Sequence, residues 1–149
     1  KNAAEALKRV AERRAVFLSR GDQSGTHDKE KSLWKAAGIS PKGRWYIESG
    51  QGMGATLTIA AEKGAYTLAD RATYLAFKRR IPLMVLLEGD AALLNIYHVL
   101  EVSPARHPRV NAAGGKAFAD FMLSAEAQQV IKAFGVEKYG EPLFFVGGG

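Results

Sequence analysis

The chain has 149 residues, of which 47% are hydrophobic and 24% charged, which suits one folded domain with its own core. Lys and Arg number 21 against 15 Asp and Glu, so the formal charge is +6 and an anionic partner is a candidate. The absence of cysteine excludes disulfides, thiolate zinc sites and cysteine nucleophiles. The longest apolar run, 81–87, contains a proline and is too short to cross a membrane.

The first residues lie inside a helical pattern, and no initiator methionine, signal peptide or lipidation motif precedes them. We therefore expect a fragment or a processed product of a longer protein.

Helical and strand-like patterns alternate along the chain. Apolar spacing, glycines and capping residues predict helices over 2–14, 26–37, 54–64, 70–78, 116–123 and 124–134. Short apolar or aromatic runs predict strands over 15–19, 43–48, 65–68, 83–87 and 96–102. Thr26 and Asp70 are the expected N-caps of the second and fourth helices. The alternation predicts an α/β fold with a mostly parallel sheet flanked by helices.

Ligands of such sheets bind beyond the carboxyl ends of the strands, where the helices begin. Three strand-to-helix junctions have an unusual composition, and they cover residues 19–27, 49–54 and 67–71. We therefore look for the function at these three junctions.

The first junction carries the residues that an anion requires. Arg20 offers a planar fork of donors, Ser24 and Thr26 offer hydroxyls, and Gly25 lets a ligand approach the main chain. A helix N-terminus adds unpaired amides and a partial positive charge. Taken singly, Ser24 or Thr26 can instead cap the helix, and Arg20 can pair with Asp22 on the surface. The complete set favours an anion site.

Other chemistry finds little support. His27 lies three residues after Ser24, but one such pair does not make a triad, and His27 is interpreted as a helix-start residue near a ligand or a packing histidine. The spacing of the histidines and acids does not match a metal-ion ligand set, and no motif predicts a cofactor. No nucleic-acid-binding module is present despite the basic charge. Without a converging nucleophile, base and orienting group, we expect no enzyme.

The residues 20–26, Arg-Gly-Asp-Gln-Ser-Gly-Thr, resemble the Arg-x-Asp-x-Ser-Gly-Thr motif of periplasmic phosphate-binding proteins. The wider pattern is more similar to the tungstate-binding proteins of ABC importers, on the segments SRGDQSGTHDKEKSLW, GRWYIESGQGMGATLTIAAEKGAYTLADRATYLAF and KAFADFMLSAEAQQVIKAFGVEKYGEPLF. The resemblance implies a type II periplasmic binding protein-like fold with two lobes. Residues 1–110 would then be the second, ligand-binding lobe and 111–149 a helical segment that returns towards a first lobe absent from this chain.

The resemblance also implies roles for individual residues. Arg20 would be the charge partner of an oxyanion, Ser24, Gly25 and Thr26 its donors, and Asp22 a brace for Arg20. At the second junction, the glycines either permit a tight turn or direct main-chain amides at the same ion, with Gly52 and above all Met53 as contacts. At the third, Arg71 is a candidate second cation, and either ion-pairs at the helix start or reaches the ligand. Asp70 either caps its own helix or orients an arginine.

The expected function is the substrate-binding component of an ABC transporter, which captures a tetrahedral oxyanion for import and has the permease as its partner. The resemblance favours tungstate, with molybdate or phosphate binding, or the effector domain of a transcription regulator, as alternatives. Tungstate is fully deprotonated and accepts hydrogen bonds only, whereas phosphate keeps a proton that a free carboxylate would accept. The directions of Asp22 and Asp70 therefore distinguish the two. The expected location is periplasmic or extracellular, and the protein would associate with the membrane by binding to the transporter.

Overall fold

The computed structural model describes residues 2–147, which fall into two units divided between Asn95 and Ile96. The helices of the first unit are α1 (Ala3–Glu12), α2 (Gly25–Ala36), α3 (Met53–Lys63) and α4 (Arg71–Phe77), followed by a short 3₁₀ turn, η1 (Ala91–Leu93). Its strands are β1 (Phe17–Ser19), β2 (Tyr46–Glu48) and β3 (Tyr66–Thr67).

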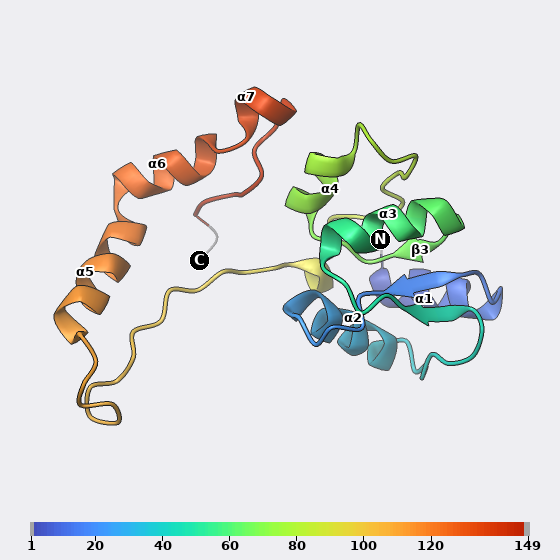
Figure 1. Cartoon of the computed structure of the whole chain (residues 1–149), viewed down its shortest axis with the longest axis horizontal. Coiled ribbons are helices and arrows are strands. Elements are labelled where there is room, and N and C mark those ends of the chain that lie inside the picture. The colour runs from blue at the N-terminus through green and yellow to red at the C-terminus, as the bar shows by residue number, and fades with distance from the viewer. Residues whose placement is uncertain (1, 148–149) are drawn as a thin grey trace. The chain divides into compact units, whose positions relative to one another are not determined.

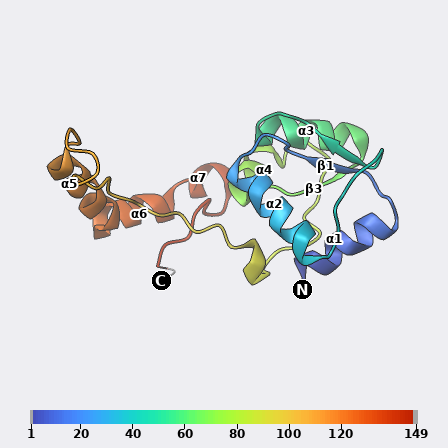
Figure 2. The ribbon, with the colours of Figure 1, turned by 90° about the horizontal axis from the view of Figure 1, so that it is seen from below.

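The three strands form one parallel sheet in the order β2-β1-β3. Phe17 of the central strand pairs with Tyr46 on one side and with Tyr66 on the other. Helix α3 lies on one face of the sheet, and α1 and α2 lie on the other (Figures 1 and 2). The predicted α/β fold with a parallel sheet and flanking helices is therefore confirmed.

Alternating side chains of β1 enter two apolar clusters. Phe17 packs with Val10 of α1 and Trp34 of α2, and its ring meets the Trp34 ring edge-on at 5.1 Å between centroids. Leu18 points to the opposite face, against Ala60 of α3. Strand β1 is covered on both faces and paired on both edges, so its position is fixed. The residues that follow it, beginning with Arg20, therefore start from a fixed point.

Two predicted strands are wrong. Residues 83–87 and 96–102 form no strand in the structure, and several of their apolar side chains are exposed, with Met84 75% and Leu100 84% accessible. Strand-like composition yields a strand only where a neighbouring backbone supplies hydrogen-bond partners. Neither segment pairs with β2 or β3, the two edge strands of the sheet, so their apolar composition alone does not make them strands.

The second unit contains α5 (Ala112–Leu123), α6 (Ala125–Ala133) and α7 (Val136–Tyr139). Helix α5 begins four residues before the predicted Lys116, because the Asn111 side chain caps it by accepting a hydrogen bond from Gly114 N at 2.9 Å. Helix α6 has the expected cap, Ser124, whose hydroxyl accepts from Ala127 N. No helix among residues 2–147 combines the length and apolarity needed to cross a bilayer.

Candidate functional site

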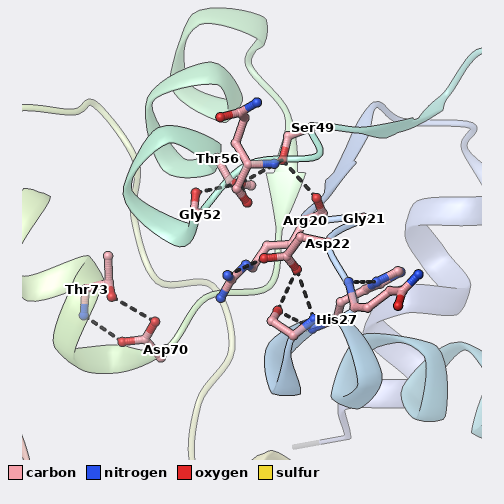
Figure 3. A network of polar contacts seen from close by, with 12 residues as sticks. Arg20, Gly21, Asp22, His27, Ser49, Gly52, Thr56, Asp70 and Thr73 are labelled. Carbon is pink, nitrogen blue, oxygen red and sulfur yellow. Dashed lines mark hydrogen bonds and ion pairs between the residues drawn. The ribbon is translucent and has the colours of Figure 1, made fainter.

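The three junctions lie at one edge of the sheet, because all three strands are parallel and each is followed by a helix. Figure 3 shows this edge, with Arg20 and Asp22 in the middle of the view, His27 on α2, Gly52 at the start of α3 and Asp70 at the start of α4. The sheet thus brings the predicted residues of all three segments to its carboxyl edge.

Arg20 follows β1 directly and pairs with Asp22, whose Oδ2 accepts from Arg20 Nη2. Both side chains are largely buried, at 17% and 19% exposure. The Arg20 Nε is buried and has no hydrogen-bond partner among the described residues. A buried donor without a partner is costly unless a ligand or water satisfies it. Arg20 therefore has donor capacity left after its pairing with Asp22.

Asp22 uses both carboxylate oxygens within its own loop. Its Oδ1 accepts from the Ser24 hydroxyl at 2.6 Å and from the Ser24 amide at 3.2 Å, while Oδ2 accepts from Arg20. These hydrogen bonds, the one from the Ser24 hydroxyl first, lower the pKa of Asp22 from 3.8 to about 2. Asp22 is therefore ionised at neutral pH and directed at its neighbours.

The N-cap of α2 is Ser24 rather than the predicted Thr26. The Ser24 hydroxyl accepts from His27 N at 3.3 Å, and Gly25 is the first helical residue. The helix starts earlier because Ser24 has the extended backbone of an N-cap and Asp22 orients its hydroxyl. Thr26 then lies in the first turn, where the amides of Gly25 and Thr26 have no partner within the helix.

His27 stabilises the loop that precedes α2. It is 7% exposed, and its Nδ1 accepts a hydrogen bond from Gln23 N at 3.1 Å. Gln23 has a φ of 59°, a left-handed backbone that a non-glycine residue rarely adopts. His27 is thus a buried residue at the start of α2, and its hydrogen bond fixes the turn of the loop at residues 20–24.

At the second junction, Gly52 is the N-cap of α3 and offers no side-chain cap. Met53 is the first helical residue, and its side chain is buried against Leu57 and Ile81. Its amide lies in the first turn, where helical amides have no partner within the helix. The structure thus leaves the predicted Met53 amide in a position to donate beyond the helix.

At the third junction, Asp70 caps its own helix. Its Oδ1 accepts from Thr73 N at 2.7 Å, and its Oδ2 accepts from the Thr73 hydroxyl at 2.8 Å. Arg71 follows as the first residue of α4 and is half-buried. Of the two alternatives for Asp70, the structure therefore shows the cap.

Sequence reasoning missed Glu30, a buried carboxylate on α2. Glu30 is 2% exposed and accepts hydrogen bonds from the Ser19 hydroxyl at 2.7 Å, the Tyr46 hydroxyl at 2.7 Å and Trp34 Nε1 at 3.0 Å. Burial, with Glu30 contributing, raises the pKa of Tyr46 above its usual range, so this hydroxyl remains a donor. The only sequence signal was a charge on the helix face that also carries Trp34.

Glu30 also contacts the loop at residues 20–24 through Ser19. The Ser19 hydroxyl donates to Glu30 and accepts from the Gly21 amide at 3.2 Å. The backbone on either side of Arg20 is thus attached to a buried carboxylate. Within residues 2–147, no group of three or more His, Cys, Asp or Glu side chains is arranged to hold a metal ion.

A family model described as a PBP superfamily domain matches residues 1–126. The chain belongs to this PBP superfamily. Its relatives include the tungstate-binding protein TupA of Peptoclostridium acidaminophilum, which is 48% identical over 139 residues that make up 93% of this chain and 49% of the relative. The tungstate-binding protein TupA of Campylobacter jejuni is 38% identical over 151 residues, covering 98% of this chain and 55% of the relative.

Solved structures of PBP-like proteins share the fold. The tungstate-binding protein TupA from Desulfovibrio alaskensis is 44% identical and superposes with a TM-score of 0.75 over 89% of this chain and 56% of its own. The structure of the tungstate ABC transporter from Geobacter sulfurreducens is 42% identical, with a TM-score of 0.73 over 90% of this chain and 57% of its own. This PBP-superfamily chain spans about half the length of the curated relatives it matches.

Proposed function

We propose that this chain is the ligand-binding lobe of the solute-binding component of an ABC transporter, and that its ligand is a tetrahedral oxyanion, tungstate. The names of the tungstate-binding relatives support the ligand class. The observation that carries the proposal is the buried Arg20 Nε without a partner at the carboxyl edge of the sheet. An oxyanion placed there would satisfy this donor and the first amides of α2.

In the first junction, the proposed ligand contacts are Arg20, the amides of Gly25 and Thr26, and the Thr26 hydroxyl. In the second junction they are Gly52 and the amide of Met53. Arg71 is the proposed second cation, and Asp22 braces Arg20. Ser24 remains a proposed contact, but its amide and hydroxyl both donate to Asp22 in the structure, so it would contact the ligand only after releasing Asp22.

The two carboxylates favour a fully deprotonated ion. Asp22 accepts from Arg20 and Ser24, and Asp70 accepts twice from Thr73. These donors direct both carboxylates at groups of the protein, and this supports a site made of donors rather than one with a carboxylate directed at the proton that phosphate carries at neutral pH. A site built from donors alone binds tungstate or molybdate better than phosphate, and the preference for tungstate rests on the relatives.

We further propose that residues 1–110 form a second lobe and that 111–149 return towards a first lobe outside this chain. Exposed apolar side chains of the second unit, among them Phe118, Leu123 and Phe134, support a covered surface in the complete protein. The complete protein would deliver its ligand to a permease from the periplasm or the cell exterior. It would have no enzymatic activity and no role in nucleic-acid binding.

A calorimetric titration of the full-length protein with tungstate, molybdate, sulfate and phosphate tests the ligand. Binding of tungstate or molybdate with no heat from phosphate supports the proposal, whereas a preference for phosphate refutes it. Arg20→Glu removes the donor fork and places a negative charge beside the ion, so tungstate affinity is expected to disappear.

Arg13→Glu is the matched control, because Arg13 is exposed and precedes β1 at the opposite edge of the sheet. It makes the same change in charge and should leave affinity within about twofold. Retained affinity in Arg20→Glu would show that another residue is the charge partner.

A further inference from the structure

Two hydroxyls, those of Ser49 and Thr56, connect two of the proposed ligand-binding loops. Ser49 follows β2, and Thr56 lies in the first turn of α3; their oxygens are 2.8 Å apart. We propose that Ser49, anchored by Thr56, is a positioning residue that holds the Arg20 loop at a fixed distance from the Gly52–Met53 loop. This inference rests on the proposed oxyanion function. Ser49 and Thr56 would support binding by holding the loops in place and would not contact the ligand themselves.

The Arg20 carbonyl is the point at which the two loops meet. It accepts from the Gly50 amide at 2.8 Å and from the Ser49 hydroxyl at 3.1 Å. Both donors belong to the turn that leads from β2 to α3. The backbone that carries the proposed charge partner is therefore held by the neighbouring loop, as the dashed line from Ser49 in Figure 3 shows.

The hydrogen-bonding capacity of Ser49 is full. A serine hydroxyl has one hydrogen to donate and two lone pairs that accept. Its hydrogen has two acceptors within reach, the Arg20 carbonyl and the Thr56 hydroxyl, both of which belong to the protein, and Gln51 N donates to its oxygen at 3.2 Å. With these three partners in place, Ser49 has no capacity left for an oxyanion, and its role is to position.

Thr56 provides the fixed end of this connection. Its side chain is fully buried, at 0% exposure, and its hydroxyl also lies 3.0 Å from the Gly52 carbonyl and 3.2 Å from the Gln51 carbonyl. The single hydrogen of Thr56 thus has three acceptors within reach, the Ser49 hydroxyl and the two carbonyls. Through these contacts, Thr56 ties the loop that carries the Met53 amide to the hydroxyl that holds Arg20.

The connection matters for binding because donors from separate loops must reach one small ion together. Hydrogen bonds to an anion have a narrow range of donor–acceptor distances, and a site held in its binding geometry avoids the entropic cost of ordering it on binding. Removing either hydroxyl would let the two loops move relative to each other. Affinity would fall although no residue in contact with the ligand has changed.

The test compares tungstate affinity in variants of the full-length protein by calorimetry, well below the thermal midpoint of every variant. Ser49→Ala and Thr56→Val remove one hydroxyl each, and the loss of one hydrogen bond corresponds to an affinity about 3- to 10-fold weaker. Because the two hydroxyls act as one unit, the double variant should be less than additively weaker. Thr56→Ser keeps the hydroxyl and should restore affinity.

Thr58→Val is the matched control on the same helix. The Thr58 hydroxyl donates to the Gly54 carbonyl at 3.1 Å and is exposed, without a contact to the Arg20 loop among the described residues. A loss of affinity in Thr58→Val as large as in Thr56→Val would show a general effect on α3 and overturn the inference. Unchanged affinity in Ser49→Ala would overturn it as well.

A ligand-free measurement separates this inference from the proposed function. Hydrogen exchange of the Gly50 amide, which donates to the Arg20 carbonyl, should become several-fold faster in Ser49→Ala (about 3-fold or more). If the wild-type protein bound none of the oxyanions, the proposed function would fail while faster exchange still supported the connection between the loops. Unchanged exchange at Gly50 would refute the connection itself.

Discussion

Gly21 lies in the loop at residues 20–24, close to Glu48 of β2, and replacing it with alanine tests how tightly this loop is packed. Its φ is +63°, and a Cβ built on it would lie 2.7 Å from the Glu48 Cβ and 3.1 Å from the Glu48 Cγ. Glu48 is held in β2 by its pairing with Ser19, so its Cβ cannot move without the strand. Gly21→Ala therefore combines a strained backbone with a steric clash.

The two effects can be separated by a second glycine. Gly64 has a similar φ of +58° with nothing within 4 Å of its Cβ position. Gly64→Ala should cost about 1 kcal/mol for the left-handed backbone alone. Gly21→Ala should cost that amount and about 1–3 kcal/mol more, the usual penalty for overpacking.

Urea unfolding followed by tryptophan fluorescence measures the difference, since Trp34 packs against Phe17 of β1. With a denaturant slope of about 2 kcal/mol per M, the midpoint of Gly21→Ala should lie about 0.5–1.5 M below that of Gly64→Ala. Tungstate affinity should fall only in Gly21→Ala, because Arg20 is adjacent. Equal midpoints for the two variants would refute the close approach of the loop to β2.

Two further predictions concern Glu30 of α2 and Asp22 of the first junction. Glu30→Ala leaves the donors of Ser19, Trp34 and Tyr46 buried without their acceptor. The free energy of unfolding, measured in urea, should therefore fall by about 3 kcal/mol or more. Glu62→Ala is the control, and because Glu62 is exposed its loss should be less than about 0.5 kcal/mol. A small effect of Glu30→Ala would contradict the buried network. Asp22 has a pKa of about 2 when folded against 3.8 ordinarily, so its stabilising effect is fully present above about pH 4 and is lost as the pH falls towards 2. The stability difference between wild type and Asp22→Asn, measured by urea unfolding from pH 2 to pH 7, should therefore shrink in that window, and a difference independent of pH would argue against the ionised Asp22.

The first half of the fold could be predicted from the sequence because its signals are local. Gly64 ends α3 in a left-handed conformation, and Asp70 caps α4, as their positions in the sequence indicate. Short apolar runs alternate with segments whose apolar residues have helical spacing. This alternation was enough to predict the parallel sheet and the three junctions at its edge.

The remaining features depend on contacts between distant residues, which a single sequence does not show. Residues 83–87 and 96–102 have the composition of strands, but a strand forms only where the chain also runs beside another strand, and these segments do not. Glu30 resembles any helix-face charge until Tyr46, sixteen positions away, supplies a donor. The choice of Ser24 over Thr26 as N-cap was decided by Asp22, which holds the Ser24 hydroxyl in place.

The order of the strands has a consequence for how the protein folds. The central strand β1 precedes both of its partners, and Leu18 pairs with Ile47 and with Thr67. Pairings between residues so far apart in sequence form late, because closing each loop costs chain entropy before any contact compensates for it. We therefore expect the loop that follows β1 to become ordered only when both crossovers have closed. In a refolding experiment, recovery of tungstate affinity should lag behind the gain of helical signal and mark completion of the sheet.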